Sequence, residues 1–106
     1  ALVSVNSGHA LSYGQDTVTE RAIQKIREQF GVAAADVFFV FNGTAANVVA
    51  LGGLTDRHEA VICSEISHLH VDECGAPEKV MGLKLIPIPH HHGKISLSDL
   101  QKVVIR

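Results

Sequence analysis

The first regular pattern along the chain is a helical one, between Thr17 and Phe30. Its apolar residues recur every three or four positions, as on the buried face of an amphipathic helix: Val18, Ala22, Ile23, Ile26 and Phe30. Asp16 precedes the pattern as a candidate N-cap, and Gly31 follows it where a helix commonly ends. The pattern predicts a helix over residues 17–30. Residues 1–16, which mix glycines with polar side chains, are predicted to be irregular.

Beyond Gly31, short apolar runs alternate with segments of helical character. The predicted strands are residues 36–41, 60–63 and 84–88, and the predicted helices are residues 44–51, 73–80 and 98–105. The helix from residue 44 is expected to end near Gly52-Gly53, and Ser96 or Ser98 is expected to cap the last helix. Alternating strands and helices are typical of βαβ units. The fold class is therefore α/β, with a mainly parallel sheet flanked by helices.

A polar turn, Asn42-Gly43-Thr44, lies between the predicted strand 36–41 and the helix that follows it. Glycine permits a close backbone approach, and Thr44 offers both an N–H and a hydroxyl at the positive end of the helix dipole. Such a junction is suited to holding an anion such as phosphate. The simpler interpretation is a tight turn with Thr44 as an ordinary N-cap. The turn matches neither a P-loop nor a G-x-G-x-x-G motif, so a nucleoside triphosphate is not expected.

Four titratable side chains crowd together after the predicted strand 60–63: His68, His70, Asp72 and Glu73. His68 is a candidate for stacking on an aromatic cofactor, for proton transfer or for ligating a metal. Alternate residues of an extended segment face one way, so His68, His70 and Asp72 also form a candidate metal site. A third interpretation is a solvated histidine-rich loop, residues 64–72, with one buried, hydrogen-bonded histidine. Because ligands bind at the carboxyl ends of parallel strands, this loop and the turn at 42–44 are expected to share one edge.

Two further stretches carry candidate chemistry. The three consecutive histidines of PHHHG, residues 89–93, point in different directions and sit in a turn, which is predicted over residues 92–94. A solvated hairpin tip is therefore favoured over a metal site. Tyr13, the single tyrosine, lies in irregular chain just before the first long helix, within Tyr13-Gly14-Gln15-Asp16.

Composition narrows the class of protein. The 106 residues are 46% hydrophobic and 19% charged, with a net charge of -2, which is typical of a globular protein and argues against nucleic acid as a partner. No apolar run approaches the roughly 18 residues of a membrane span, and no signal peptide is visible. Cys63 and Cys74 fit no metal or redox spacing, so a reducing, cytoplasmic setting is expected, although their pairing is left open. The chain begins without methionine and ends without helix-stop residues, so a fragment is expected.

Four stretches, taken in order, resemble the threonine aldolase branch of the β-eliminating lyases. They are SYGQDTVTERAIQKI, FVFNGTAANVVAL, AVICSEISHLHVDECGAPE and KLIPIPHHHGKISLSDL. The resemblance covers nearly the whole chain, and several motifs in the right order are more specific than any one of them. It implies the N-terminal part of the large domain of an enzyme with the aspartate aminotransferase fold, which uses pyridoxal 5′-phosphate. Residues 17–106 would belong to that incomplete domain, with residues 1–16 as an irregular segment before it.

The resemblance implies roles for individual residues. Gly43 and Thr44 match a Ser-Gly-Thr turn that grips the cofactor phosphate, and Asn42 replaces the serine. His68 matches the histidine that lies over the pyridine ring.

The acidic residue of a His-x-x-x-x-Glu-x-Gly pattern matches as Glu73, which would orient water or shuttle protons on the substrate side. Tyr13 matches the tyrosine of a Tyr-Gly-x-Asp motif close to the active site.

The implied activity is retro-aldol cleavage of a β-hydroxy-α-amino acid, with threonine giving glycine and acetaldehyde, by a homodimer or homotetramer. The family's Schiff-base lysine lies in a Ser-Lys context that this sequence lacks, so the chain alone is expected to be inactive. Three alternatives stay open: another β-eliminating lyase of amino acid metabolism, a phosphate-binding α/β module without catalysis, and a metal-dependent hydrolase built on histidine and aspartate.

Overall fold

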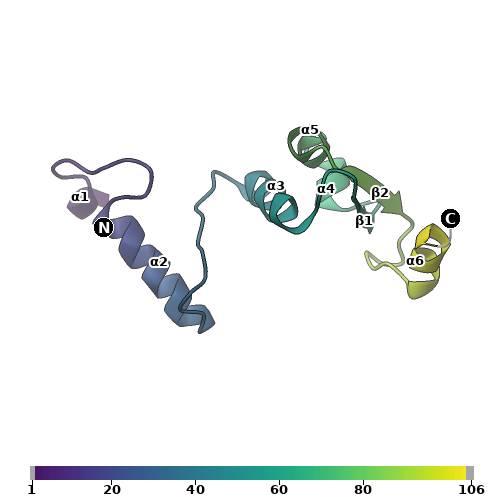
Figure 1. Cartoon of the computed structure of the whole chain (residues 1–106), viewed down its shortest axis with the longest axis horizontal. Coiled ribbons are helices and arrows are strands. Elements are labelled where there is room, and N and C mark those ends of the chain that lie inside the picture. Colours follow the sequence, from purple (N-terminus) through teal and green to yellow (C-terminus); the bar gives the residue numbers. More distant parts are fainter. Residues whose placement is uncertain (1, 105–106) are drawn as a thin grey trace. The chain divides into compact units, whose positions relative to one another are not determined.

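The computed structural model describes residues 2–104, and its regular elements are shown in Figure 1. They are α1 (Leu2–Val5), α2 (Thr17–Phe30), α3 (Gly43–Leu54), β1 (Ala60–Ser64), α4 (His68–Val71), α5 (Ala76–Met81), β2 (Lys84–Ile88) and α6 (Leu97–Val104). The chain divides into two compact units, one ending at Phe39 and the other beginning at Val40. None of the helices described is long and apolar enough to cross a membrane.

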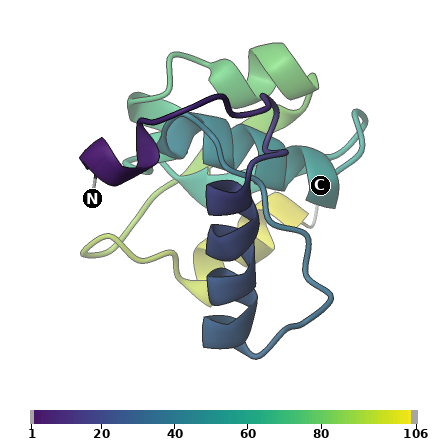
Figure 2. The same cartoon turned by 90° about the vertical axis from the view of Figure 1, so that its left-hand side faces the viewer.

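The first unit is built around α2 (Figure 2). This helix has the predicted bounds and both predicted caps. Asp16 accepts hydrogen bonds from the Val18 and Thr19 N–H groups at 3.0 and 2.9 Å and from the Thr19 hydroxyl at 2.6 Å. The Thr19 hydroxyl, followed by the backbone donors, lowers the pKa of Asp16 because these bonds stabilise the ionised carboxyl. Gly31 ends the helix at φ 67°, in the left-handed region. Within the segment predicted to be irregular, α1 forms a single helical turn.

The strand predicted over residues 36–41 is not formed. These residues form no helix or strand, and the side chains of Phe38 and Phe41 are 71% and 98% exposed. A strand needs a hydrogen-bonded neighbour, and among residues 2–104 the strands β1 and β2 pair only with each other. An apolar run in the sequence predicts burial, but it does not show whether a neighbouring strand is present to pair with it.

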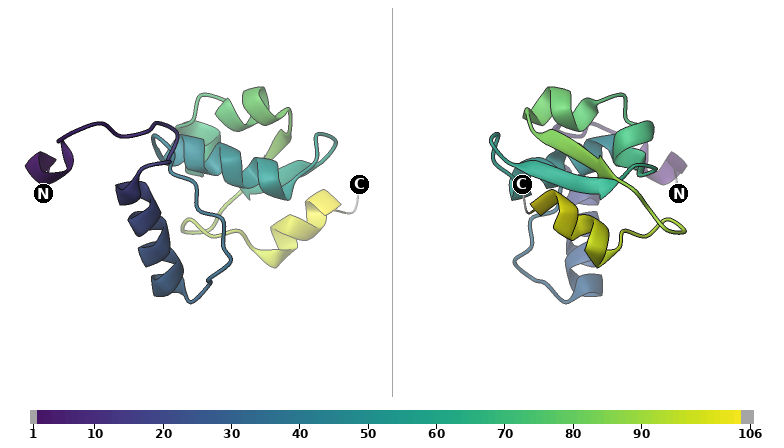
Figure 3. Two further views of the ribbon diagram at one scale, coloured as in Figure 1. Left: turned by 60° about the vertical axis from the view of Figure 1, so that its left-hand side comes forward. Right: turned by 90° about the vertical axis from the view of Figure 1, so that its right-hand side faces the viewer.

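The second unit contains the predicted βαβ arrangement. β1 and β2 pair in parallel, with Ala60 opposite Lys84 and Cys63 opposite Pro87. The views in Figure 3 place α5 and α6 on opposite sides of the two strands. The core of the second unit contains Cys63, Leu83 and Leu85, with Leu51, Val61, Leu69 and Met81 packed against them. Cys63 and Cys74 are both free thiols.

Helix α3 runs past the point where it was predicted to stop. Instead of ending near Gly52-Gly53, it continues to Leu54. A Cβ on Gly52 would lie 2.1 Å from the Met81 Cε atom, so this glycine lets α5 approach α3 closely. The prediction was wrong because the sequence alone does not distinguish a glycine that allows close helix packing from one that ends a helix.

Two other boundaries differ from the prediction. The segment 64–72 is not all loop, because α4 forms one helical turn there, and α5 begins at Ala76 rather than at residue 73. Helix α6 begins at Leu97, and Ser96 caps it by accepting a hydrogen bond from the Asp99 N–H group at 3.1 Å. Residue 105, included in the predicted last helix, lies outside the described residues.

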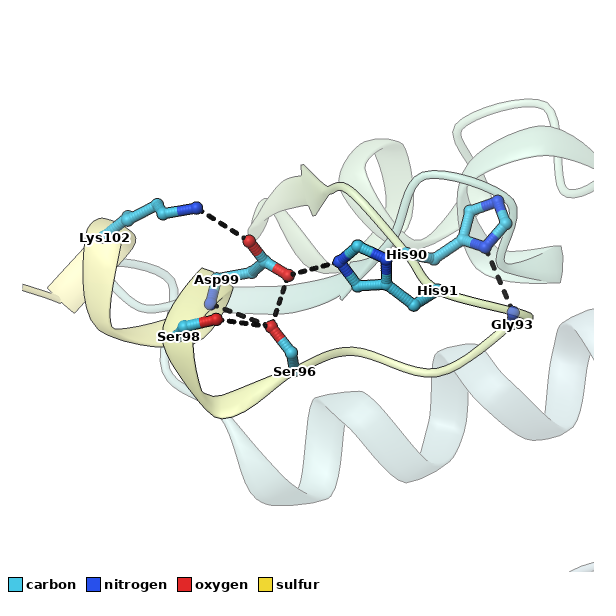
Figure 4. A network of polar contacts seen from close by, with 7 residues as sticks. All are labelled: His90, His91, Gly93, Ser96, Ser98, Asp99 and Lys102. Carbon is cyan, nitrogen blue, oxygen red and sulfur yellow. Dashed lines mark hydrogen bonds and ion pairs between the residues drawn. The ribbon is translucent and has the colours of Figure 1, made fainter.

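The PHHHG stretch forms the predicted hairpin tip, and the side chains of His90 and His91 point in different directions (Figure 4). His91 and Lys94 exchange backbone hydrogen bonds of 2.8 and 3.1 Å, and the His90 Nδ1 atom accepts one from the Gly93 N–H group. The His91 Nε2 atom lies 3.4 Å from the buried Asp99 carboxylate, which also accepts from Lys102 and from the Ser96 hydroxyl. The Ser96 hydroxyl, followed by Lys102, lowers the pKa of Asp99 by stabilising its charge. This cluster fastens the hairpin to α6.

Candidate functional site

The N-terminus of α3 presents unused hydrogen-bond donors. Asn42 lies at the N-cap, where its Oδ1 atom accepts from the Ala45 N–H group at 2.9 Å and its carbonyl accepts from Ala46 at 3.1 Å. The N–H groups of Gly43 and Thr44 and the Thr44 hydroxyl make no hydrogen bond within the described chain. Because the capping bond uses Oδ1, the Nδ2 group of Asn42 remains available as a donor.

This donor set has the chemistry and the space that a phosphate requires. A Cβ built on Gly43 would meet nothing within 4 Å, so the backbone there is open to a ligand. Two adjacent N–H groups and a hydroxyl lie at the end of a 12-residue helix, where the helix dipole contributes roughly half a positive charge. An anion with several acceptor oxygens matches this arrangement.

A second group of polar side chains converges on Glu73. The Glu73 Oε1 atom lies 2.7 Å from the His68 Nδ1 atom and accepts from the Asn47 Nδ2 atom at 2.5 Å. Glu73 has a fully buried side chain, whereas the His68 side chain is 62% exposed. The Glu73 Oε2 atom is buried and has no hydrogen-bond partner. A buried carboxylate is thus joined to an exposed imidazole.

Local backbone geometry brings His68 and Glu73 together although they are five positions apart. α4 makes one turn from His68 to Val71, and the Asp72 N–H group donates to the His68 carbonyl at 3.0 Å. Cys74 and Gly75 then adopt φ values of 50° and 70°, both in the left-handed region. Positive φ is uncommon for a residue other than glycine, and such conformations concentrate at functional sites.

The pair has a defined chemistry. A carboxylate can only accept, so Nδ1 of His68 is the donor and, in the neutral ring, Nε2 is left without a proton. Nε2 can then accept a proton from a bound molecule. An exposed imidazole oriented in this way by a buried carboxylate is suited to general base catalysis.

The metal-site alternative lacks the geometry it requires. His68 and His70 both lie in α4, and residues two apart in a helix point about 200° apart around its axis. Within residues 2–104, no group of three histidine, cysteine or acidic side chains could hold a metal ion. The alternative assumed an extended segment, and the segment is a helical turn instead.

Tyr13 belongs to the first unit, and its role stays a prediction. It has φ 60° and a 99% exposed side chain, and it lines a groove together with Gly14, Thr19, Ile23 and Val37–Phe39. The remaining candidates all lie in the second unit, where Asn42 caps the helix that carries Gly43, Thr44 and Asn47.

Sequence reasoning missed Asn47. After Thr44 it is the single polar side chain of α3, in the run GTAANVVALGGL. It lies three residues, about one turn, beyond Thr44. A lone amide within an otherwise apolar helix was the signal that could have identified it, because such a group is seldom left without a partner when buried.

Comparisons with known proteins relate the chain to one family. The family model of the β-eliminating lyases matches residues 1–106. A low specificity L-threonine aldolase of Pseudomonas sp. (strain NCIMB 10558) is 41% identical over 107 residues, covering 100% of this chain and 31% of that protein. The corresponding protein of Pseudomonas aeruginosa is 40% identical, with the same coverage.

A solved structure of Leishmania major threonine aldolase superposes with a TM-score of 0.84 and 31% sequence identity, covering 95% of this chain and 29% of that one. The predicted fold class, part of an α/β domain of this enzyme fold, is confirmed. The chain spans less than a third of the length of the curated relatives it matches, 31% in both cases.

Proposed function

Since the chain belongs to the β-eliminating lyase family, we propose that it supplies part of the cofactor pocket of a pyridoxal 5′-phosphate-dependent lyase of the threonine aldolase type. One observation carries the proposal. Asn47 of α3 and His68 of α4 meet on a single buried carboxylate oxygen, so the phosphate-suited helix end and the exposed imidazole belong to one connected site. The similarity to threonine aldolases of two Pseudomonas species supports the reaction type.

In this proposal the N-terminus of α3 binds the cofactor phosphate. Gly43 and Thr44 donate their N–H groups and the Thr44 hydroxyl, none of which has a partner within the described chain. Asn42 replaces the serine expected at the first position of the turn and fixes the helix end through Oδ1. Its Nδ2 group is one further donor.

Bound pyridoxal 5′-phosphate supplies an electron sink for the bond that breaks at the substrate α-carbon. His68 would lie over the pyridine ring, and its exposed imidazole leaves a face free for that contact. Retro-aldol cleavage also requires removal of the β-hydroxyl proton of the amino acid. We assign that proton to the His68 Nε2 atom, either directly or through a water molecule, with Glu73 holding Nδ1.

The complete protein is expected to contain the rest of the active site. We expect the Schiff-base lysine to lie outside these 106 residues, which form part of one larger domain, and the active enzyme to be a homodimer or homotetramer. Exposed aromatic side chains at Phe38 and Phe41 support burial against further protein. The free thiols of Cys63 and Cys74 support a reducing, cytoplasmic setting.

Product analysis of the complete enzyme tests the reaction type. Incubation with threonine is expected to release glycine and acetaldehyde in equal amounts, because the bond between the α- and β-carbons breaks without net oxidation. Release of ammonia and a keto acid instead would identify a β-elimination and refute the aldolase assignment. Serine serves as a comparison substrate in the same product analysis, since it carries the same β-hydroxyl group as threonine without the methyl group.

A further inference from the structure

The carboxylate of Glu73 is held by two donors from two different elements. Asn47 approaches from α3 and His68 from α4, and both contact the same oxygen, Oε1. The other oxygen, Oε2, is buried without a partner. The carboxylate is therefore fixed through one atom.

Of the two contacts, the one from Asn47 is the better protected from solvent. The His68 side chain is 62% exposed, whereas Asn47 is partly buried within α3. A hydrogen bond to a charged acceptor is stronger than a neutral one, and low polarity around the buried carboxylate strengthens it further. With Asn47 removed, Glu73 would keep one exposed partner and could rotate away from His68, which would leave Nδ1 without its acceptor.

We infer that Asn47 is a positioning residue that acts on His68 through Glu73. It holds the Glu73 carboxylate against the imidazole and so keeps the proton of the neutral ring on Nδ1. Asn47 lies about one turn beyond Thr44 on α3. The same amide therefore links the position of the imidazole to that of the helix end suited to phosphate. The catalytic consequence rests on the proposed function, whereas the effect on the histidine tautomer does not.

The direct test measures the His68 tautomer in the complete protein without cofactor. Solid-state NMR spectra of protein with ¹⁵N-labelled histidine distinguish a protonated Nδ1 from a protonated Nε2, and the His68 signals are identified by their loss in His68→Phe. The wild type is expected to carry its proton on Nδ1. Asn47→Leu, which has a similar size and no donor, is expected to show a mixture of both tautomers.

Matched variants separate positioning from a structural role. Asn47→Gln retains an amide donor and is expected to restore the Nδ1 tautomer at least in part. Val49→Ala lies on the same helix, at a half-exposed side chain without polar contacts, and is expected to match the wild type. Should Asn47→Leu fail to fold, Asn47→Ala is smaller and also removes the N–H donor. A wild-type tautomer in the folded donor-free variant would overturn the inference.

Kinetics provide the second measurement. In the cofactor-loaded enzyme, Asn47→Leu is expected to lower kcat by about 10–100-fold, the size of effect seen when the partner that orients a metal-ligating histidine is removed. The affinity for pyridoxal 5′-phosphate is expected to stay within about threefold, because Asn47 contributes no donor at the helix end. Loss of affinity without loss of kcat would show that Asn47 supports only the phosphate site. A changed tautomer in a protein that binds no cofactor would sustain the inference and refute the proposed function.

Discussion

His68→Phe in the complete enzyme is expected to lower turnover of threonine by about 10²–10⁴-fold while pyridoxal 5′-phosphate stays bound. Phenylalanine keeps a flat ring, and stacking is worth only about 0.5–1.5 kcal/mol beyond the area it buries. The variant therefore retains most of the contact with the cofactor. It loses the Nε2 atom to which the β-hydroxyl proton is assigned, so the loss is expected in kcat.

His70→Phe is the matched control, because His70 lies in the same helical turn and its side chain makes no hydrogen bond in the described structure, where only its backbone N–H group donates, to the Ser67 carbonyl. It is expected to leave both turnover and the cofactor absorbance close to the wild type. Equal loss of activity in both variants, accompanied by loss of a bound metal ion, would contradict the assignment and favour a hydrolase built on His68 and His70.

Thr44→Val is expected to weaken binding of pyridoxal 5′-phosphate by about 1–3 kcal/mol, the usual loss when a hydrogen bond to a charged group is removed. Valine has nearly the shape of threonine, so the N–H groups of Gly43 and Thr44 keep their places and the hydroxyl alone is lost. Equilibrium dialysis of the complete enzyme against the cofactor measures the change directly.

Thr55→Val serves as its control at the other end of α3. The Thr55 hydroxyl donates to the Leu51 carbonyl at 2.7 Å, so its removal affects the C-terminal end of the helix and is expected to leave cofactor affinity unchanged. Unchanged affinity in Thr44→Val, or an equal loss in both variants, would show that the Thr44 hydroxyl does not bind the phosphate.

The elements that the sequence predicted well are those whose signals are local. α2 has its predicted bounds because Asp16 and Gly31 act as caps on their immediate neighbours. β2 also has its predicted bounds, and β1 extends one residue beyond its own. Both strands are short apolar runs, and they pair with each other.

The errors arose where a residue's role depends on distant chain. Residues 36–41 have the composition of a strand, yet a strand forms only beside a partner, and composition does not reveal whether one is present. Gly52 has the signature of a helix end, but its contact with Met81 of α5 gives it a packing role instead. A single-sequence pattern does not distinguish these cases.

The sequence singled out the segments of the candidate site but not the contact between them. The turn at Asn42–Thr44 and the histidine-rich segment were both identified from residue types and from the resemblance to threonine aldolases. Asn47, which connects the turn to the histidine-rich segment through Glu73, was not identified, because Glu73 lies 26 positions away in the sequence. Hydrogen bonds between distant positions become visible only when the fold is known.

The cofactor absorbance of the complete protein tests the central claim most directly. Purified protein is expected to show the yellow band of protein-bound pyridoxal 5′-phosphate, to lose it on treatment with borohydride, and to hold one cofactor per chain. The band is expected to persist in His68→Phe and to require more added cofactor in Thr44→Val. A colourless protein that takes up no pyridoxal 5′-phosphate and contains stoichiometric zinc would contradict the account.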